Sequence, residues 1–409
     1  MNILFVAPRL PLPADTGGKI RTLNILKQIA KANKVVLLCF SFEVDDAKYQ
    51  KELEGLGIEC HLVPMKDTPV WRKIFNVLFS SVPHSIAKYR TKLMRKKVEA
   101  LLSGSSFDAV HVDHLHMAHY APGKKSKVFS VLDEHNVEYK ILERCAKVER
   151  SPVKKMVYMG QAVKMHLFEA HQAQQFRGVF TCSEDDRSIL NKITNGMVPI
   201  HVIPNGVDTE YFQAQDTRHP SASPGTGRTQ DQEDAMVFTG SMDWLPNDDA
   251  ITYFCAQILP LIWKENKNIK LYVVGKSPSA SVRELAAQDR RVIVTGRVED
   301  VRPYIEKAKI FIVPLRIGGG TRLKILEAMA MNKATVSTSI GAEGIEYTDG
   351  VNIAIADAPD HFARSVVSLI ENDKISRALG EAGRCLVCEK YDWNVIGKKI
   401  KILYQGSLK

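Results

Sequence analysis

The chain has 409 residues, of which 45% are hydrophobic and 25% are charged, so it is long enough for two globular domains with ordinary cores. The formal net charge is +10, and residues 1–205 carry all of the excess, with 30 Lys and Arg against 20 Asp and Glu. Seven scattered cysteines predict no disulfide framework, no apolar run approaches the roughly 20 residues that span a bilayer, and the N-terminus lacks the charged start of a signal peptide. We therefore expect a reduced, cytoplasmic protein.

Short apolar runs rich in β-branched residues alternate with helical patterns in the first half of the chain. This alternation predicts a parallel sheet whose right-handed crossover helices cover both faces. Strands are expected at 3–7, 35–40, 58–63, 109–112, 128–132, 178–182 and 201–203, and helices at 18–31 and 45–56.

The positive charge of the first half is densest between Trp71 and Lys97, where eight Lys or Arg residues occur without an acid. Trp, Phe, Ile and Leu side chains are interleaved with these cations. A basic segment with an apolar, aromatic face is suited to the surface of an anionic membrane, which we favour as the partner of 71–97. A solvated helix face is the plain alternative. Nucleic acid is a weaker one, because no nucleic-acid-binding motif accompanies the charge.

Residues 213–235 contain no large apolar residue and are rich in Gly, Pro, Ser, Thr and Asp, which predicts a solvated linker. The alternation then restarts, with strands at 236–240, 269–274, 292–295, 310–314 and 334–337, and helices at 251–262 and 321–331. We predict two doubly wound domains, at 1–212 and 236–390, followed by a terminal helix at 391–409. Ligands of such sheets bind at the carboxyl ends of the strands, so the cleft between the domains is the expected site.

The most informative stretch is 314–330, where an apolar run ends in a glycine loop that leads into a helical segment. Backbone N–H groups and the positive end of the helix dipole meet there, which favours the binding of a phosphate. Two cations, Arg322 and Lys324, strengthen the case. Further along, Glu327 can accept hydrogen bonds from sugar hydroxyls. The alternative is a glycine-rich turn with surface cations. The residues of this loop are Gly318, Gly319, Gly320, Thr321, Arg322 and Lys324.

Other motifs exclude two common nucleotide-binding classes. There is no G-x-G-x-x-G after the first strand and no P-loop motif, so a dehydrogenase and a P-loop ATPase are not expected. Instead, Gly17 and Gly18 open the first helix directly after a strand, which suits a close backbone approach, although a plain turn explains them too.

A group of histidines and an aspartate follows the strand expected at 109–112. Alternate residues of a strand point to opposite faces, which argues against a metal site. We expect Asp113 or His114 to line an acceptor site, with a metal site and plain loop polarity as alternatives. The full group is His111, Asp113, His114, His116 and His119.

The chain resembles the retaining GT-B glycosyltransferases of family 4 over nearly its whole length. The resemblance rests on five stretches, PLPADTGG (11–18), LDEHN (132–136), TCSEDD (181–186), VIPNGVDTEYF (202–212) and GGGTRLKILEAMA (318–330). The tail at 391–405 resembles the terminal helix of the family, which crosses back onto the first domain. GSMDWLPN (240–247), together with 314–330, resembles a bacterial exopolysaccharide subgroup that includes sugar transferases linked to exosortase/PEP-CTERM systems.

The resemblance implies an α/β fold of the GT-B type, in which two Rossmann-like domains, the first for the acceptor and the second for the nucleotide sugar, face each other across a cleft. It implies that Gly17 and Gly18 let the donor phosphate and the acceptor approach the first helix. It places His135 against the donor sugar, and Glu327 against the ribose hydroxyls. Arg322 and Lys324, with the amides of 319–321, hold the diphosphate.

The activity implied is retaining transfer of a hexose from a nucleotide-diphosphate sugar to a saccharide or lipid-linked acceptor, in exopolysaccharide or cell-surface glycan synthesis. No metal or other cofactor is expected, and the protein is placed in the cytoplasm or peripherally on the inner face of the membrane. A sugar-nucleotide epimerase or hydrolase, and a non-catalytic scaffold, are alternatives on the same architecture. The donor sugar and its base, uridine or guanosine, stay open.

The sequence departs from the family pattern at two places. The glutamate that the family carries eight residues before Glu327 is Gly319 here, so donor hydroxyl recognition cannot use that side chain. Asp243 and Asn247 stand where the family supplies an Arg and a Lys to the pyrophosphate. We infer that Arg322 and Lys324 supply the charge instead.

Overall fold

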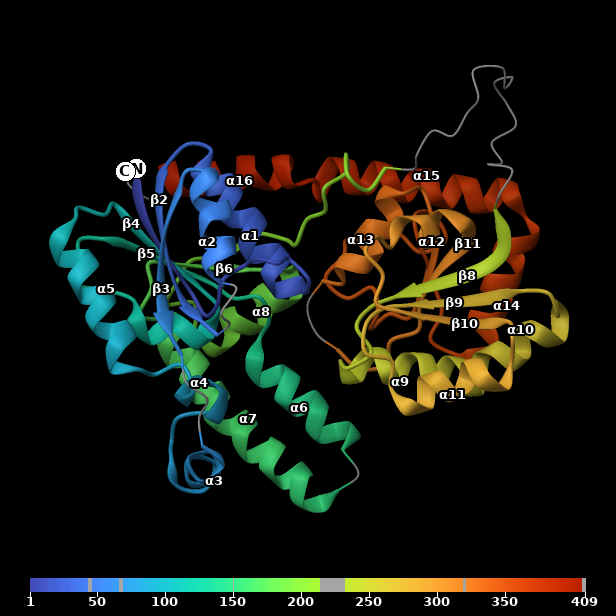
Figure 1. The fold of residues 1–409 in the computed structure, drawn as a ribbon, viewed down its shortest axis with the longest axis horizontal. Helices are drawn as coiled ribbons and strands as arrows, with labels where there is room; N and C mark the ends of the chain where they lie inside the picture. The colour runs from blue at the N-terminus through green and yellow to red at the C-terminus, as the bar shows by residue number, and fades with distance from the viewer. Residues whose placement is uncertain (43–45, 66–68, 150, 214–231, 319–320, 407–409) are drawn as a thin grey trace. The chain divides into compact units, whose positions relative to one another are not determined.

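The computed structural model describes residues 1–42, 46–65, 69–149, 151–213, 232–318 and 321–406 (Figure 1). The chain divides into two compact units. Unit 1 comprises Met1–Asn205 and Trp393–Lys409, and unit 2 comprises Gly206–Asp392. Each unit contains one sheet in which every strand pairing is parallel, with helices packed on it.

Unit 1 carries a seven-stranded sheet in the order β3-β2-β1-β4-β5-β6-β7. Its strands are β1 (Asn2–Ala7), β2 (Lys34–Ser41), β3 (Ile58–Pro64), β4 (Ala109–Asp113), β5 (Phe129–Asp133), β6 (Gly178–Thr181) and β7 (Ile200–Val202). Its helices are α1 (Gly17–Ala30), α2 (Asp46–Gly55), α3 (Val70–Phe79), α4 (His84–Ala87), α5 (Lys92–Gly104), the 3-10 helix η1 (Leu115–Tyr120), α6 (Glu138–Val148), α7 (Pro152–Ala173), α8 (Glu184–Ile193) and α16 (Trp393–Gly406).

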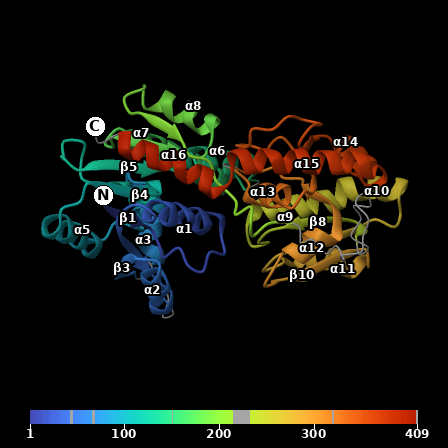
Figure 2. The same cartoon turned by 90° about the horizontal axis from the view of Figure 1, so that it is seen from above.

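The sheet of unit 1 is buried on both faces, which explains why its strands are continuous apolar runs. Along β1, Ile3 and Phe5 face one core, which is completed by α1, α2 and α16. The alternate residues Leu4 and Val6 face a second core, which is completed by α4, α5, η1, α7 and α8. Figures 1 and 2 show α1 and α16 side by side, and Lys31 of the α1 C-cap donates to the Asn394 side chain at 2.9 Å.

Unit 2 carries a six-stranded sheet in the order β10-β9-β8-β11-β12-β13 around one continuous core. Its strands are β8 (Glu233–Thr239), β9 (Lys270–Val274), β10 (Val292–Gly296), β11 (Ala308–Val313), β12 (Ala334–Ser337) and β13 (Ala354–Ile355). Its helices are α9 (Leu245–Tyr253), the π-helix η2 (Phe254–Ile258), α10 (Leu259–Glu265), α11 (Ala280–Gln288), α12 (Arg302–Lys307), α13 (Leu323–Ala330), α14 (Pro359–Glu371) and α15 (Asp373–Lys390).

The predicted fold class, two doubly wound α/β domains, is confirmed, and each strand expected from the sequence is present within a few residues. The helix expected at 251–262 is instead divided among α9, η2 and α10. Pro260 stands at the second position of α10, and a proline inside one uninterrupted helix would remove a backbone hydrogen bond.

The unit boundaries differ from the predicted ones at the junction. Residues 206–212 group with unit 2, not with the first domain, because Val207 forms an isolated parallel β-bridge with Asp392, two residues after α15. The Val207 amide donates to the Tyr391 carbonyl at 2.9 Å, and the Thr209 hydroxyl donates to Asp392 at 2.6 Å. Of the predicted linker, 214–231 lies outside the described residues, while Glu233–Ala235 belong to β8 rather than to a loop.

The last helix, α16, is part of unit 1, as the resemblance implied. Its Trp393, Ile396, Ile400 and Tyr404 are buried in the core of that unit. Tyr404 also forms a 2.7 Å hydrogen bond with His111 of β4, so a polar contact fixes the helix in one rotational setting.

Both sheets have the same kind of switch point. The chain moves outward in one direction from β1 and in the other from β4, and likewise from β8 and from β11. In doubly wound sheets the crevice at the carboxyl ends of these two central strands is where ligands bind. The loops after β1, β4, β8 and β11 are therefore the places to look for functional side chains.

Candidate active site

The loops at the switch point of unit 2 bring a lysine into an unusual environment. The Lys324 ammonium, at the start of α13, donates to the Asn247 side-chain oxygen of α9 at 2.9 Å and lies 3.9 Å from the centre of the Phe238 ring. Asn247 in turn donates to the Ser241 carbonyl at 2.8 Å, which fixes its orientation. Burial, and then the neighbouring Arg322, lower the pKa of Lys324 to about 7.

Two glycines with positive φ make this arrangement possible. Gly240, which follows β8, has φ 151°, and a β-carbon there would lie 2.7 Å from the Lys324 nitrogen. Gly318, which follows β11, has φ 154°, and a β-carbon there would lie 1.7 Å from a guanidinium nitrogen of Arg322. Any side chain at either position would displace the cation next to it.

The remaining predicted residues of unit 2 lie around the same helix start. The Thr321 hydroxyl donates to the Gly344 carbonyl at 3.3 Å, just before Arg322, the N-cap residue of α13. Glu327 is one turn further along, and burial raises its pKa to about 7, although Lys324 opposes the shift. Gly319 and Gly320 lie outside the described residues. Asn247 and Asp243 are the two positions that depart from the family pattern. Asn247 accepts a hydrogen bond from Lys324, whereas Asp243 accepts one from the Ser241 hydroxyl.

In unit 1, two aspartates end neighbouring strands. Asp113 is the last residue of β4 and Asp133 is the last residue of β5, and the two are paired in register. Both side chains are fully buried. Asp133 accepts from the buried guanidinium of Arg21 at 2.6 Å, and Arg21 also donates to the Ile203 carbonyl at 2.9 Å and to Asn205 at 3.1 Å. This buried ion pair joins α1, β5 and the segment after β7.

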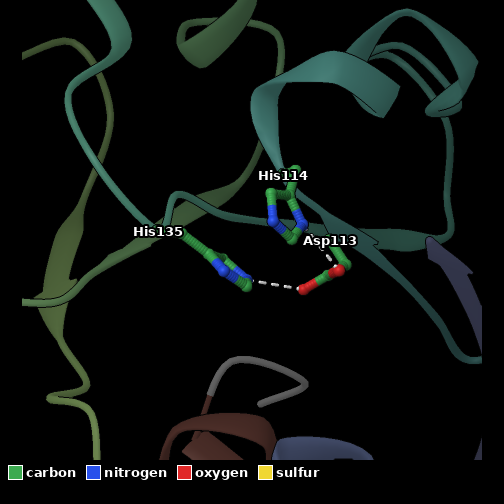
Figure 3. Close-up of side chains that lie close together, drawn as sticks. All are labelled: Asp113, His114 and His135. Carbon is green, nitrogen blue, oxygen red and sulfur yellow. Dashed lines mark hydrogen bonds and ion pairs between the residues drawn. The ribbon is translucent and has the colours of Figure 1, made fainter. Parts of the chain in front are cut away.

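Asp113 holds two histidine rings at once. His114 Nδ1 lies 2.7 Å from one carboxylate oxygen, His135 Nε2 lies 2.8 Å from the other, and the Thr22 hydroxyl donates to the first at 2.8 Å (Figure 3). Burial would raise the pKa of Asp113, but the two histidines outweigh it and hold that pKa well below its usual range. An ionised carboxylate only accepts, so both ring nitrogens facing it carry hydrogen.

The pKa values of the two rings are shifted in opposite directions. Burial opposes the charge on His114, but Asp113 outweighs it and raises the pKa of His114. Burial, and then the adjacent His114, lower the pKa of His135 to about 4. Near neutral pH the pair therefore favours one imidazolium, His114, beside one neutral imidazole, His135. Their ring centres are 3.6 Å apart.

The outward nitrogens of both rings converge on one point beside α1. A β-carbon on Gly18 would lie 3.4 Å from His114 Nε2 and 3.8 Å from His135 Nδ1. With the charges given above, His114 Nε2 offers a hydrogen and His135 Nδ1 offers a lone pair. A donor and an acceptor side by side match the two hydrogen-bonding functions of a sugar hydroxyl.

His114 also has a strained backbone. Its φ of 68° with ψ of 142° is a combination that L-residues rarely adopt, and it costs on the order of 1–3 kcal/mol. The His114 amide donates to the Asp133 carbonyl at 2.9 Å, which holds the residue in place. Strain of this kind concentrates at functional sites, where the surrounding structure maintains a required side-chain direction.

A set of buried carboxyls lies beside the histidines. Glu169 of α7 accepts from the amides of Glu138 and Tyr139 at 2.7 and 3.2 Å, and so satisfies the first turn of α6. Burial raises the pKa of Glu138 to about 7 and that of Glu169 to about 8. Glu134, which is also buried, has its pKa raised by burial and then by Glu169. All three pKa values are shifted upward, which favours the protonated carboxyls and opposes three neighbouring negative charges.

The predicted histidine group is only partly brought together. Asp113 and His114 share the site with His135, whereas His111 faces Tyr404 and stacks on Phe5 at 4.4 Å. Two sets of side chains have the spacing that a metal ion requires, Asp113–His114–His135 and His111–Asp113–Asp133. In both sets the carboxylates already accept hydrogen bonds from protein donors, so a metal would have to replace those bonds.

Family comparisons identify the architecture. The model described as Glycosyltransferase Family 4 matches residues 17–211, and the model described as Glycosyl transferases group 1 matches residues 233–372. The chain is a GT-B glycosyltransferase of family 4. The two models divide the enzyme as the two units do, with the histidine site in the first match and the lysine site in the second.

Individual relatives extend over the whole chain. The glycosyltransferase is 23% identical to an uncharacterized 44.6 kDa protein in the cps region of Klebsiella pneumoniae, over 96% of each chain. It superimposes on sucrose-phosphate synthase from Thermosynechococcus elongatus with a TM-score of 0.69 at 15% identity, over 99% of this chain and 98% of the other. Anabaena Alr3699/HepE in complex with UDP-glucose gives 0.67 at 13% identity, over 99% and 100%. At such identities the likeness establishes the fold.

Three residues of the glycosyltransferase site were not predicted from the sequence. They are Arg21, Thr22 and Asp133. Thr22 donates to Asp113, which holds both histidines, and Arg21 pairs with Asp133 at the end of β5. Asp133 lies inside the LDEHN stretch that carried the family resemblance, so its place two residues before His135 was the available signal. Arg21 and Thr22 gave no comparable signal, because buried and exposed polar residues of a helix look alike in sequence. None of the helices in the described part of the chain combines the length and apolar composition that a bilayer crossing requires.

Proposed function

We propose that the glycosyltransferase moves a hexose from a nucleotide-diphosphate sugar to a saccharide or lipid-linked acceptor. The observation that carries this proposal is the placing of Arg322 and Lys324 at the start of α13, beside two glycines that leave room for them. Lys324 is held by a neutral amide and an aromatic ring, not by a carboxylate. Half-buried cations of this kind are complementary to a diphosphate.

The chemistry needs charge stabilisation more than a protein base. When the bond between the sugar anomeric carbon and the phosphate oxygen breaks, the diphosphate gains negative charge, which Arg322, Lys324 and the α13 dipole would stabilise. In the retaining course that we propose, the acceptor hydroxyl forms the new bond on the same face and passes its proton to the leaving phosphate. Neither step draws on a metal, because the two cations supply the positive charge. Glu327 is assigned to the ribose hydroxyls.

The histidine pair is assigned to sugar hydroxyls. His135 offers a lone pair and His114 offers a hydrogen at one point beside Gly18, so together they can hold and orient one hydroxyl. The sequence resemblance assigns His135 to the donor sugar, whereas the polar residues at the end of β4 led to the expectation that Asp113 or His114 lines an acceptor site. Because Asp113 anchors both rings, we propose that donor and acceptor recognition share this carboxylate. Gly17 and Gly18 would let the substrate approach α1 closely.

A biological setting is suggested by two comparisons. The Klebsiella pneumoniae relative is encoded in a cps region, which supports a role in exopolysaccharide or cell-surface glycan synthesis. Alr3699/HepE was solved with UDP-glucose, which supports a nucleotide-sugar donor. We also propose that the enzyme works peripherally at the inner face of the cytoplasmic membrane, with 71–97 near the lipid.

The decisive experiment is a thermal-shift screen of the purified protein against UDP, GDP and their sugars. A ligand at 100 times its Kd stabilises the fold by roughly 2.7 kcal/mol. The nucleotide sugar so identified is then tested for nucleoside diphosphate release with and without saccharide acceptors. Release that requires the acceptor supports glycosyl transfer. Acceptor-independent turnover would indicate an epimerase or hydrolase, and no binding of any nucleotide would indicate a scaffold.

A further inference from the structure

Two helices of unit 1 expose apolar side chains to an extent unlike the rest of the described chain. None of the ten residues of α3 is buried, and Trp71, Phe75 and Phe79 are 64, 60 and 73% exposed. On α7, Val153, Met156, Val163 and Leu167 are each more than 60% exposed. We call the exposed apolar residues of these helices the α3/α7 surface. They are Val70, Trp71, Ile74, Phe75, Leu78, Phe79, Val153, Met156, Val157, Met159, Val163 and Leu167.

The exposed residues of α7 form a stripe along the helix. Positions 153, 156, 160, 163 and 167 are spaced three or four residues apart and therefore share one face. The opposite face, with Gln161, Met165 and Glu169, packs on unit 1. A stripe of this kind on a water-soluble helix normally faces a core. Here it faces away from the core of its own unit.

The two helices are joined directly. The Lys164 ammonium of α7 donates to the Val77 carbonyl of α3 at 2.8 Å, and the Gln161 side chain accepts from the amide of His84, just after α3, at 2.9 Å. Lys164 is adjacent in sequence to Val163 of the stripe. Segments that are about 80 residues apart in the chain are therefore in contact, and Figure 1 shows α3 close to α7.

The charges around this surface are of one sign. On α3, Arg72 and Lys73 are exposed, and on α7 Lys154 and Lys155 are exposed. The only carboxylate in either helix is Glu169, which is fully buried. A protein partner or a second copy normally meets a rim of mixed charge, whereas an apolar surface whose two helices expose Lys and Arg but no carboxylate matches a bilayer with anionic headgroups.

We propose that the α3/α7 surface binds the interface of an anionic lipid bilayer, with both helices lying in the plane of the membrane. Trp71 and the Phe side chains would enter the boundary between headgroups and acyl chains, and the Lys and Arg side chains would reach the headgroup phosphates. This surface replaces the sequence-based assignment to 71–97 in two respects. It adds α7, which the sequence analysis did not single out, and it leaves out the basic residues of α5.

Two of the basic residues in and just before α5 are engaged differently. Arg95 contacts the His119 carbonyl at 3.4 Å and lies over the Tyr120 ring, and Arg90, just before α5, lies over the Phe168 ring. These cations pack on their own unit. The dense positive charge of the sequence is thus only partly available to a membrane, and the apolar side chains of α3 and α7 carry the greater share of the binding.

The experiment is co-sedimentation of the full-length protein with vesicles of phosphatidylcholine alone or mixed with phosphatidylglycerol. We expect binding to the mixed vesicles, weakening with salt, and little to phosphatidylcholine alone. Phe75→Glu on α3 and Val163→Glu on α7 should each weaken binding by about tenfold or more, since each places a carboxylate in the interface. Ile402→Glu, at a 67% exposed position on α16, is the matched control and should bind as the unsubstituted protein does.

Three results would overturn the proposal. They are no binding to mixed vesicles, unchanged binding by both glutamate variants, and a dimer in light scattering that Val163→Glu dissociates. Melting temperatures should be the same for all three variants, because the replaced side chains are exposed. The proposal deepens the peripheral membrane location proposed above, but it does not rest on the glycosyl transfer, since no nucleotide sugar is used. Either proposal can fail while the other stands.

Discussion

The two candidate sites occupy equivalent places in two similar sheets, yet they treat charge in opposite ways. In unit 1 each charged group has an oppositely charged neighbour, Asp133 with Arg21 and Asp113 with His114. In unit 2 Lys324 is held by an amide oxygen and an aromatic ring, next to a second cation, Arg322. The first arrangement fixes the orientation of side chains. The second holds the Lys324 ammonium through a neutral amide rather than a carboxylate, an arrangement that favours an anion beside it.

This contrast explains the direction of the pKa shifts. A buried carboxylate that accepts several hydrogen bonds stays ionised, and the pKa of Asp113 is lowered accordingly. A half-buried lysine without such a partner loses part of its preference for the proton, and its pKa falls to about 7. A bound diphosphate would supply the missing negative charge. The site in unit 1 thus holds its side chains in fixed orientations, whereas the site in unit 2 favours the binding of an anion.

The largest effect is expected from removing a cation of unit 2. Arg322→Ala should lower kcat/KM for the nucleotide sugar by on the order of 10²-fold, because the departing diphosphate loses a partner that matters most in the transition state. Steady-state kinetics would measure this. Arg316→Ala is the control, since Arg316 lies in the same loop but pairs with Asp249 at 2.6 Å. Near-normal turnover of Arg322→Ala would contradict the assignment.

Asp113→Asn tests the positioning role of unit 1. The amide offers one acceptor oxygen where the carboxylate offers two, so one histidine must change its hydrogen-bonding state. We expect kcat to fall by on the order of 10²-fold, the lower end of the range typical of an acid–base group. The pKa of His114, followed by NMR, should fall because its anionic partner is gone. An unchanged His114 titration would show that Asp113 does not set the charge of the pair.

The pH dependence of donor binding separates the two sites. Lys324 has a pKa of about 7 in the ligand-free protein, and a bound diphosphate should raise it. Binding should therefore be tightest below pH 7 and weaken as the pH rises above it, by at most about tenfold per unit, with a proton taken up on binding. Calorimetry in buffers of different ionisation enthalpy would detect that proton. Lys324→Met should abolish the uptake, whereas His135→Asn should leave it unchanged.

The smallest effect is expected from Tyr404→Phe, which removes only the hydrogen bond from α16 to His111. A free energy of unfolding lower by about 1 kcal/mol is typical for such a bond. Because His111 is 3.8 Å from Asp133 but does not reach the histidine pair, kcat should stay within about twofold. Denaturant unfolding and kinetics on the same preparation would measure both. A large loss of activity at normal stability would show that α16 acts on the site.

Much of the second site was predictable from local sequence. A glycine loop that leads to Arg322, Lys324 and a helix predicts an anion-binding helix start within about ten residues, and local patterns are what a sequence displays best. The same holds for the alternation of strands and helices, because periodicity follows from backbone geometry. The partner of Lys324 was not predictable, since Asn247 is 77 residues away.

The sequence by itself determined the fold class, the two doubly wound units and the residue types at both strand ends, because each depends on neighbours within one turn or one strand. Only the tertiary structure decided that Asp113 joins His114 to His135, that Arg21 locks the strand ends, and that α3 and α7 share one apolar surface. Those contacts join segments tens of residues apart, and the packing of the sheet, not the local pattern, sets which of them meet.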